Sequence, residues 1–424
     1  MTFTADAGCA ARLDADDPLA RFRDQFCLPL GPGGEPEIYL VGNSLGLATT
    51  HTRQYVDAEL DSWATRGVRG HFEGDHPWTP YHELLSAPMA ELVGARPAEI
   101  VVMNALTVNL HLLLVSFYRP TPHRHKILIE EHAFPSDHFA VESQIRHHGL
   151  DPESSLVVIG PRPGQELIDH DDLLSAIDEH GEELAVVLLP GVQYYTGQVF
   201  DMSDLVRATH ACGARVGFDL AHAAGNIPMH LHDWNVDFAA WCTYKYLNGG
   251  PGSAGAAFVH ERHLGDGKIP RFEGWWGTNK HTRFEMATTF DPIPTVEAWQ
   301  LSNAPILSMA AIRASLDLFE AAGGIEVLRA KSEKQLAWLD YLLDSRFAGR
   351  VESITPRALS QRGCQFALRV TSPGRDGRAV FEALEVAGVA CDWRYPDVIR
   401  VAPVPLYNSF TDIWRFTEIL DGLV

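Results

Sequence analysis

Short apolar runs alternate with helical patterns through the middle of the chain, between about residues 100 and 260. The run Ala185–Leu189 is wholly apolar, which is typical of a strand covered on both faces of a parallel sheet. We predict strands at Ile100–Met103, Lys126–Glu130, Ser155–Ile159, Ala185–Leu189, Val216–Leu220, Phe238–Cys242 and Ala256–Val259. Most of these strands are separated by predicted helices, at Val108–Phe117, Ser136–His148, Asp171–His180 and Ser203–Cys212.

This alternation predicts an α/β fold with a large domain, whose mostly parallel sheet is covered by helices on both faces, and a smaller α+β C-terminal domain. We expect an N-terminal arm at 1–40 that packs with the small domain, the large domain at 41–304 and the small domain at 305–424. Residues 261–300 lack clear periodicity, and a loop of that length in a compact domain is usually functional.

The ends of the chain add further elements to this outline. Toward the N-terminus we predict a short helix near Pro18–Phe26, a strand at Ile38–Val41, and helices at about 50–66 and 80–94. The small domain is predicted to hold helices at 305–322, 325–345 and Thr411–Leu420, with strands near Gln365–Val370, Val389–Trp393 and Ile399–Ala402.

Composition excludes several classes of function. Of the 424 residues, 46% are hydrophobic, enough for a substantial core, and the net charge of −21 disfavours nucleic acid and anionic membranes as partners. The six cysteines form no Cys-x-x-Cys pair, and no apolar run approaches the ~20 residues of a membrane span. No signal peptide is visible. We therefore expect a cytoplasmic protein with reduced thiols.

One lysine, Lys245, interrupts an apolar run between Tyr244 and Tyr246 and is followed by a glycine-rich loop. Burying a bare ammonium group is costly, so a lysine in such a place needs a partner or loses its proton and becomes a nucleophile. A nucleophilic lysine commonly holds pyridoxal phosphate as a Schiff base. The alternative is a lysine at a strand end whose ammonium group reaches solvent.

Three patterns resemble known functional motifs but lack the structural context that those motifs require. Gly42–Gly46 matches Gly-x-Ser-x-Gly, but only one strand precedes it, whereas the nucleophile elbow of a hydrolase follows several. Gly250–Gly255 matches Gly-x-Gly-x-x-Gly, yet it leads into a strand and not a helix, so we interpret it as clearance near a ligand. The close histidine pairs, such as His230 and His232, lack the spacing of a metal site, and no metal is expected.

Candidate chemistry gathers where several predicted strands end. Asp219 ends one strand and could keep a pyridine nitrogen protonated, although a helix cap would look the same. Thr107 lies at a helix start, which suits a phosphate group, and a plain capping threonine is the alternative. Phe134 and Asp137 follow another strand and offer an aromatic face and a second carboxylate. Tyr244 adds a hydroxyl beside Lys245.

From about residue 38 to the C-terminus, these motifs together make the chain resemble the kynureninase family. Several long motifs in the right order make the resemblance specific, though each alone is modest. They are Asn104–Leu110, Phe134–Asp137, Tyr195–Gln198, Gly217–His222, Tyr244–Asn248 and Ile399–Phe410. The resemblance implies a homodimeric pyridoxal phosphate enzyme of the aspartate aminotransferase fold with active sites at the subunit interface. It also implies hydrolytic cleavage of L-kynurenine or 3-hydroxy-L-kynurenine.

The resemblance also implies roles for individual residues. Lys245 and Tyr244 would be catalytic, with Lys245 bound covalently to the cofactor. Arg400 would bind the α-carboxylate of the substrate, as an arginine fork suits that task. The cofactor would contact Leu106, Thr107, Phe134, Pro135, Ser136, Asp137, Asp219, His222, Tyr244, Lys245, Trp275 and Asn303. Trp275 and Asn303 would act across the dimer. The remaining residues expected near the substrate are Ser44, His71, Ser302 and Asn303.

Two positions, Pro190 and Cys364, raise questions about individual contacts, and other functions of related enzymes are alternatives. Pro190 stands where some relatives carry a hydroxyl residue that touches the cofactor. Cys364 lies where related cysteine desulfurases have a catalytic thiol, but here it begins a predicted strand, which favours a packed thiol. The alternative functions are a cysteine desulfurase or β-lyase of the same superfamily, or a non-catalytic cofactor-binding protein. The sequence leaves the preferred ring substituent open.

Overall fold

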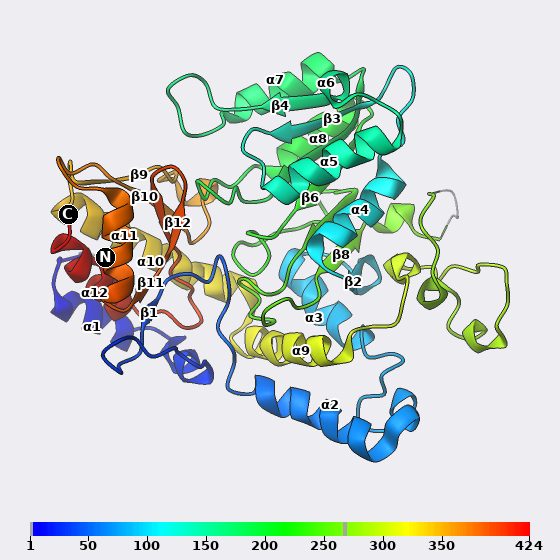
Figure 1. Ribbon diagram of the computed structural model, residues 1–424, viewed down its shortest axis with the longest axis horizontal. Coiled ribbons are helices and arrows are strands. Elements are labelled where there is room, and N and C mark those ends of the chain that lie inside the picture. Colours follow the sequence, from blue (N-terminus) through cyan, green and yellow to red (C-terminus); the bar gives the residue numbers. More distant parts are fainter. Residues whose placement is uncertain (1–2, 266–268) are drawn as a thin grey trace.

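A seven-stranded sheet forms the centre of the computed structural model, which describes residues 3–265 and 269–424 (Figure 1). The strand order is β2-β8-β7-β6-β5-β3-β4, and β8 runs opposite to the other six strands. The predicted α/β architecture is confirmed. The strands are β2 (Ile100–Val102), β3 (Lys126–Glu130), β4 (Leu156–Ile159), β5 (Leu184–Pro190), β6 (Arg215–Asp219), β7 (Phe238–Trp241) and β8 (Ala256–Val259).

Helices cover both faces of this sheet, which explains its apolar strands. In β5, Val186 and Leu188 pack toward α4 and α5, whereas Val187 and Leu189 belong to the core on the opposite face. Side chains on a strand alternate between faces, so a strand covered twice needs apolar residues at every position. The flanking helices are α3 (Glu83–Val93), α4 (Leu106–Phe117), α5 (Pro135–His147), α6 (Pro152–Ser155), α7 (His170–His180), α8 (Met202–Ala211) and α9 (Ile306–Ala321). Helix α2 (Thr52–Arg66) packs on the outside of α9.

A second core surrounds a four-stranded antiparallel sheet of order β12-β13-β10-β9, near both chain ends (Figure 1). The N-terminal helix α1 packs against the C-terminal helix α12, and β1 pairs in parallel with β11. Residues from both ends of the chain therefore share this core. Its elements are α1 (Ala7–Ala15), β1 (Ile38–Tyr39), α10 (Gly324–Arg346), β9 (Val351–Ser353), β10 (Phe366–Val370), α11 (Gly377–Val386), β11 (Val389–Ala390), β12 (Asp392–Arg394), β13 (Val398–Val401) and α12 (Phe410–Asp421).

Several predicted elements differ from the structure. The strand predicted at Val389–Trp393 is wrong as a single element, because β11 and β12 pair with different sheets on either side of Cys391. The helix predicted near Pro18–Phe26 is a 3-10 helix at Ala20–Gln25. The helices α1, α6 and α11 and the strand β9 are absent from the predictions, and Ser155, predicted as the first residue of a strand, ends α6. In the segment 261–300 the described residues form only short 3-10 helices, and residues 266–268 lie outside the described part.

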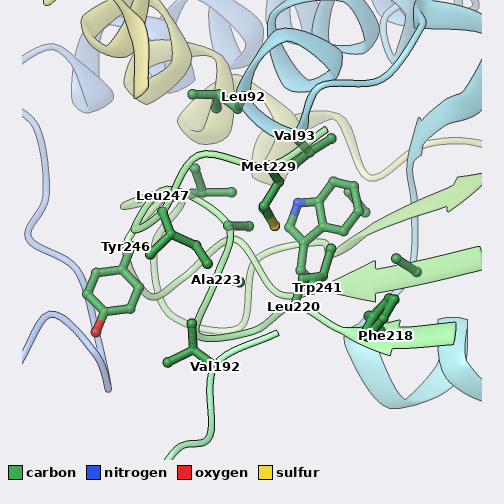
Figure 2. Packing of buried hydrophobic residues seen from close by; sticks show 14 of the residues in the cluster. Leu92, Val93, Val192, Phe218, Leu220, Ala223, Met229, Trp241, Tyr246 and Leu247 are labelled. Carbon is green, nitrogen blue, oxygen red and sulfur yellow. The ribbon is translucent and has the colours of Figure 1, made fainter. Parts of the chain in front are cut away.

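A buried apolar cluster includes residues on both sides of the Lys245 loop, among them Trp241 and Leu247. Figure 2 shows Trp241, at the end of β7, beside Met229 and Val93, with Leu247 and Ala223 farther along the same cluster. Trp241 is fully buried. Burial of such a large aromatic side chain contributes several kcal/mol, and it fixes the strand end from which the loop begins. Among the described residues, no helix is long and apolar enough to cross a membrane.

Candidate active site

A cavity of about 200 Å³ lies where β3, β5 and β6 end and the loop after β7 begins. This is the edge of an open α/β sheet at which ligands bind. The structure brings most of the predicted cofactor residues together here. Its walls are formed by Ala105, Leu106, Thr107, Glu130, Phe134, Ser136, Asp137, Pro190, Val192, Tyr194, Asp219, Ala221, His222, Tyr244 and Lys245.

The first turn of α4 gives the cavity an anion-binding end. The N-cap residue of α4 is Ala105, whose side chain makes no capping hydrogen bond. The helix begins at Leu106, one residue before the predicted start, so Thr107 lies inside the first turn. Uncapped N–H groups and the helix dipole favour a phosphate group. Buried Asn109 fixes the turn by donating to the Met103 carbonyl (2.8 Å) and accepting from Asn104 (3.1 Å).

The last glycine of the Gly250–Gly255 loop lets this helix start approach the sheet. A Cβ atom on Gly255 would lie 2.7 Å from the Trp241 carbonyl oxygen and 3.2 Å from the Leu106 nitrogen. Any side chain at residue 255 would push β7 and the start of α4 apart. The glycine therefore provides clearance for the backbone that forms the anion site, which refines the expectation of clearance near a ligand.

Three carboxyl groups lie close to one another in the wall of the cavity. Asp219 ends β6, and its Oδ1 accepts from the Ala221 N–H at 2.7 Å. Asp137, in the first turn of α5, lies within hydrogen-bond reach of Asp219, and burial together with the Asp219 charge raises its pKa well above the ordinary value. Burial and the Asp219 charge also raise the pKa of Glu130 to about 8. The cluster thus retains protons that isolated carboxyl groups would lose.

Lys245 faces this cluster from the loop after β7. Its Nζ lies 2.9 Å from Nε2 of His222 and 5.8 Å from the centroid of the Phe134 ring. Burial, followed by the charge of Lys245, lowers the pKa of His222 far below its ordinary value, so the imidazole is neutral and accepts a hydrogen bond from the amine. The half-buried lysine lines the cavity, so its amine is available to a ligand bound there.

Tyr244 and the loop beneath it complete this wall. Burial raises the pKa of Tyr244, so its phenol remains a proton donor at neutral pH. The Gly46 N–H donates to the Tyr244 carbonyl at 2.8 Å, and a Cβ atom on Gly46 would lie 2.2 Å from the Lys245 carbonyl oxygen. The turn Gly42–Gly46 is therefore a support for the lysine loop and carries no nucleophile elbow.

Arg400 lies behind the cavity on β13 and is fully buried. Its Nη1 donates to the Tyr194 carbonyl at 2.6 Å, and its Nε donates to Asp392 Oδ1 at 2.6 Å. The ring of Tyr194 lines the cavity and meets Phe134 edge-to-face at 5.2 Å between centroids. Arg400 therefore lies next to Tyr194 and is not itself among the residues that line the cavity.

The other predicted residues do not line the cavity of their own chain. Ser44 lies in the supporting turn, and Pro135 is the first residue of α5, just outside the lining. The ring of His71 packs against Trp78 at 5.3 Å. The remaining three residues, Trp275, Ser302 and Asn303, are exposed on the surface.

Sequence reasoning missed two polar residues that line the cavity, Glu130 and Tyr194. Glu130 ends β3 at the same sheet edge as Asp219, and that position was a usable signal. Tyr194 reaches the cavity through the packing of a loop, which local sequence patterns do not report. Pro190 pairs with Asp219 across β5 and β6 and lines the cavity without offering a donor.

A larger cleft of about 870 Å³ lies elsewhere, between α8 and α10, and its described walls hold carboxylates such as Asp169 and Glu326 but no lysine. The smaller cavity is the one that combines an anion-binding helix start, an aromatic face, a buried acid and a primary amine. These groups fit a flat, phosphorylated aromatic aldehyde.

Comparisons with known proteins agree with this geometry. The family model described as the kynureninase C-terminal domain matches residues 328–420. The kynureninase of Myxococcus xanthus (strain DK1622) is 52% identical over 97% of this chain and 96% of its own length. That of Koribacter versatilis (strain Ellin345) is 52% identical over 98% of this chain and 97% of its own.

A solved structure, the apo form of a cysteine desulfurase from Thermococcus onnurineus NA1, superimposes with a TM-score of 0.75. It is 18% identical and covers 98% of each chain, so it is similar in fold. The 52% identity to two kynureninases over almost their full length is the evidence for the family, whereas the solved structure shows the fold alone. The chain therefore belongs to the kynureninase family.

Proposed function

We propose that this protein hydrolyses the Cβ–Cγ bond of L-kynurenine or 3-hydroxy-L-kynurenine, producing L-alanine and anthranilate or 3-hydroxyanthranilate. One water molecule is consumed, and no other reactant is needed. The observation that carries the proposal is the full-length identity of about half to kynureninases, together with a cavity that holds an amine, a neutral histidine and a buried acid.

Pyridoxal phosphate is the cofactor of the proposed reaction. Lys245 would hold it covalently, Leu106 and Thr107 would hold its phosphate at the start of α4, and Phe134 would lie against its ring. Asp219 would pair with the pyridine nitrogen, supported by Asp137. When bound, the cofactor supplies an acceptor for the electrons of a carbanion.

The proton transfers fall to this chain's own residues. The Nζ of Lys245, beside neutral His222, can accept the α-proton of the substrate and later return a proton. The phenol of Tyr244 has a pKa raised by burial and serves as the second proton donor. Arg400, behind Tyr194, is the proposed residue for the α-carboxylate of the substrate.

The proposal includes a homodimer with active sites at the subunit interface. It is supported by exposed aromatic residues outside the cavity: the Trp275 side chain is 47% exposed, and the rings of Phe72 and Phe284 meet at 5.6 Å on the surface. Trp275 and Asn303 would reach the cavity of the other copy, and His71 and Ser302 would surround the substrate ring. We propose a cytoplasmic enzyme with no membrane or nucleic-acid partner.

Lys245→Ala tests the assignment directly. The variant is expected to lose both the visible absorbance of the bound cofactor and alanine release from L-kynurenine. Survival of both signals would refute the assignment of Lys245. Catalytic efficiency on kynurenine and 3-hydroxykynurenine, measured side by side, decides the preferred ring substituent.

A cysteine desulfurase is the second candidate, favoured by the likeness of fold. The state of Cys364 disfavours a desulfurase, because this residue is 1% exposed and burial raises the pKa of its thiol to about 12. A desulfurase requires a thiolate, and this thiol is held in its protonated form. Cys364→Ala should therefore retain kynurenine turnover. The desulfurase would be favoured if the wild type released sulfide from cysteine and Cys364→Ala did not.

A further inference from the structure

Two arginines share a single carboxylate beside the cavity. Asp392 pairs in register with Arg400 across β12 and β13 and accepts from its Nε at 2.6 Å and from its Nη2. Arg394, two residues along the same strand, donates from Nη2 to Asp392 Oδ2 at 3.1 Å. Residues two apart on a strand point to the same face, so the three groups form one cluster, called here the Arg394–Asp392–Arg400 cluster.

This cluster carries two positive charges and one negative charge, so it is one anion short. Arg400 is saturated on its Nε side, and its Nη1 is held by the Tyr194 carbonyl. Arg394 makes one hydrogen bond to Asp392, while its Nε is buried and has no hydrogen-bond partner among the described residues. Burial and the charge of Arg400 lower the pKa of Arg394, which reflects this imbalance. A half-buried guanidinium in this position is ready to accept a second carboxylate.

The cluster adjoins Tyr194, which is one of the residues that line the cavity. The guanidinium carbon of Arg400 lies 6.0 Å from the centroid of the Tyr194 ring, and that ring lines the cavity. The charges of both arginines also act on His222, on the far side of Tyr194. Trp393, between Asp392 and Arg394 in the chain, packs instead toward Phe381 of α11, with ring centroids 6.2 Å apart.

We propose that Arg394 is a second substrate-binding residue, which binds the α-carboxylate together with Arg400, while Asp392 holds both guanidinium groups in place. The proposal rests on the function proposed above. The substrate carboxylate supplies the missing negative charge, and Arg394, with its unused donors and a side chain that is 35% exposed, is the more accessible of the two arginines. The site thereby selects amino acids over the corresponding amines.

The test compares the holoenzyme with Arg394→Gln, Arg394→Lys and a control, Arg378→Gln. Arg378 also lies beside this strand, with its guanidinium carbon 5.8 Å from the Trp393 ring, but on the α11 side. We measure KM and kcat for L-kynurenine, and inhibition by kynuramine, which lacks the α-carboxylate. Arg394→Gln should raise KM roughly 10- to 100-fold with kcat little changed, as expected for loss of a charge-assisted hydrogen bond.

Inhibition by kynuramine should stay within about twofold in Arg394→Gln, because that ligand makes no carboxylate contact. Arg394→Lys should lie between wild type and Arg394→Gln, since it keeps the charge without the fork. Arg378→Gln should match wild type. An unchanged KM in Arg394→Gln, or equal weakening of kynurenine and kynuramine binding, would overturn the proposal. Absence of kynurenine turnover in the wild type would instead overturn the proposed function.

Discussion

Replacement of Glu130 by glutamine should make the protein more stable at alkaline pH than the wild type. Glu130 is 3% exposed, and burial together with the nearby Asp219 charge raises its pKa from 4.5 to about 8. The folded protein therefore keeps a proton that the unfolded chain loses above about pH 4.5. The folded state is most favoured below that pH, and its free energy of unfolding falls as the pH rises toward 8.

The magnitude follows from the interval between the two pKa values. At 1.36 kcal/mol per pH unit, the full interval corresponds to roughly 5 kcal/mol, and relaxation around a buried charge reduces this to about 2–5 kcal/mol. Glutamine is similar in size and does not ionise, so Glu130→Gln escapes this loss. At pH 5 the two proteins should differ only by the effect of the substitution itself.

Paired thermal melts of wild type and Glu130→Gln at pH 5 and pH 8.5 measure this change. Cofactor-free protein is used, so that titration of the pyridine nitrogen does not contribute. We expect the Tm difference to shift by about 5 °C in favour of the variant between the two pH values. Glu131→Gln is the matched control, because Glu131 is the next residue and is exposed. A Tm difference that is the same at both pH values would refute the reasoning.

Two further substitutions probe the start of β7 and the support of the Lys245 loop. Burial alone would raise the pKa of Asp237, but hydrogen bonds from His210 and His263 and the charge of Arg262 hold it well below the ordinary value. Asp237→Asn should therefore cost about 3–5 kcal/mol of stability, measured by denaturant titration at neutral pH, and a loss below 1 kcal/mol would contradict this account. Gly46→Ala should lower Tm and weaken cofactor retention, because its Cβ atom would lie 2.2 Å from the Lys245 carbonyl oxygen. The control Gly33→Ala, with no atom near its Cβ position, should do neither.

The central sheet could be predicted because each of its strands is recognisable from its own run of apolar residues. A strand covered on both faces is apolar throughout, as in β5, and its ends follow from the residues that break the run. The division between β11 and β12 could not be predicted. It depends on Ile38, which pairs with Val389 from the other end of the chain, and no local pattern near Cys391 reports that distant partner.

The same contrast applies to the candidate site. Asp219, Phe134 and Lys245 follow strand ends, and parallel strands bring their carboxyl ends to one edge, so their proximity could be expected. The pairing of Asp392 with Arg400 depends on the register of an antiparallel pair, which the sequence does not state. Residues such as Trp275, outside the cavity of their own chain, remain predictions tied to the proposed dimer.

The pairing of β1 with β11 can form only late in synthesis on the ribosome, because the two strands lie near opposite ends of the chain. The cavity is built from residues between Ala105 and Lys245, so all of its walls are available while the second half of the chain is still being made. Ile38 must wait, without its partner, until Val389 has left the ribosome. During that interval α1 and β1 expose apolar surface that only the last part of the chain can cover. A newly made chain therefore contains every residue of its cofactor pocket before Val389 is available to pair with Ile38.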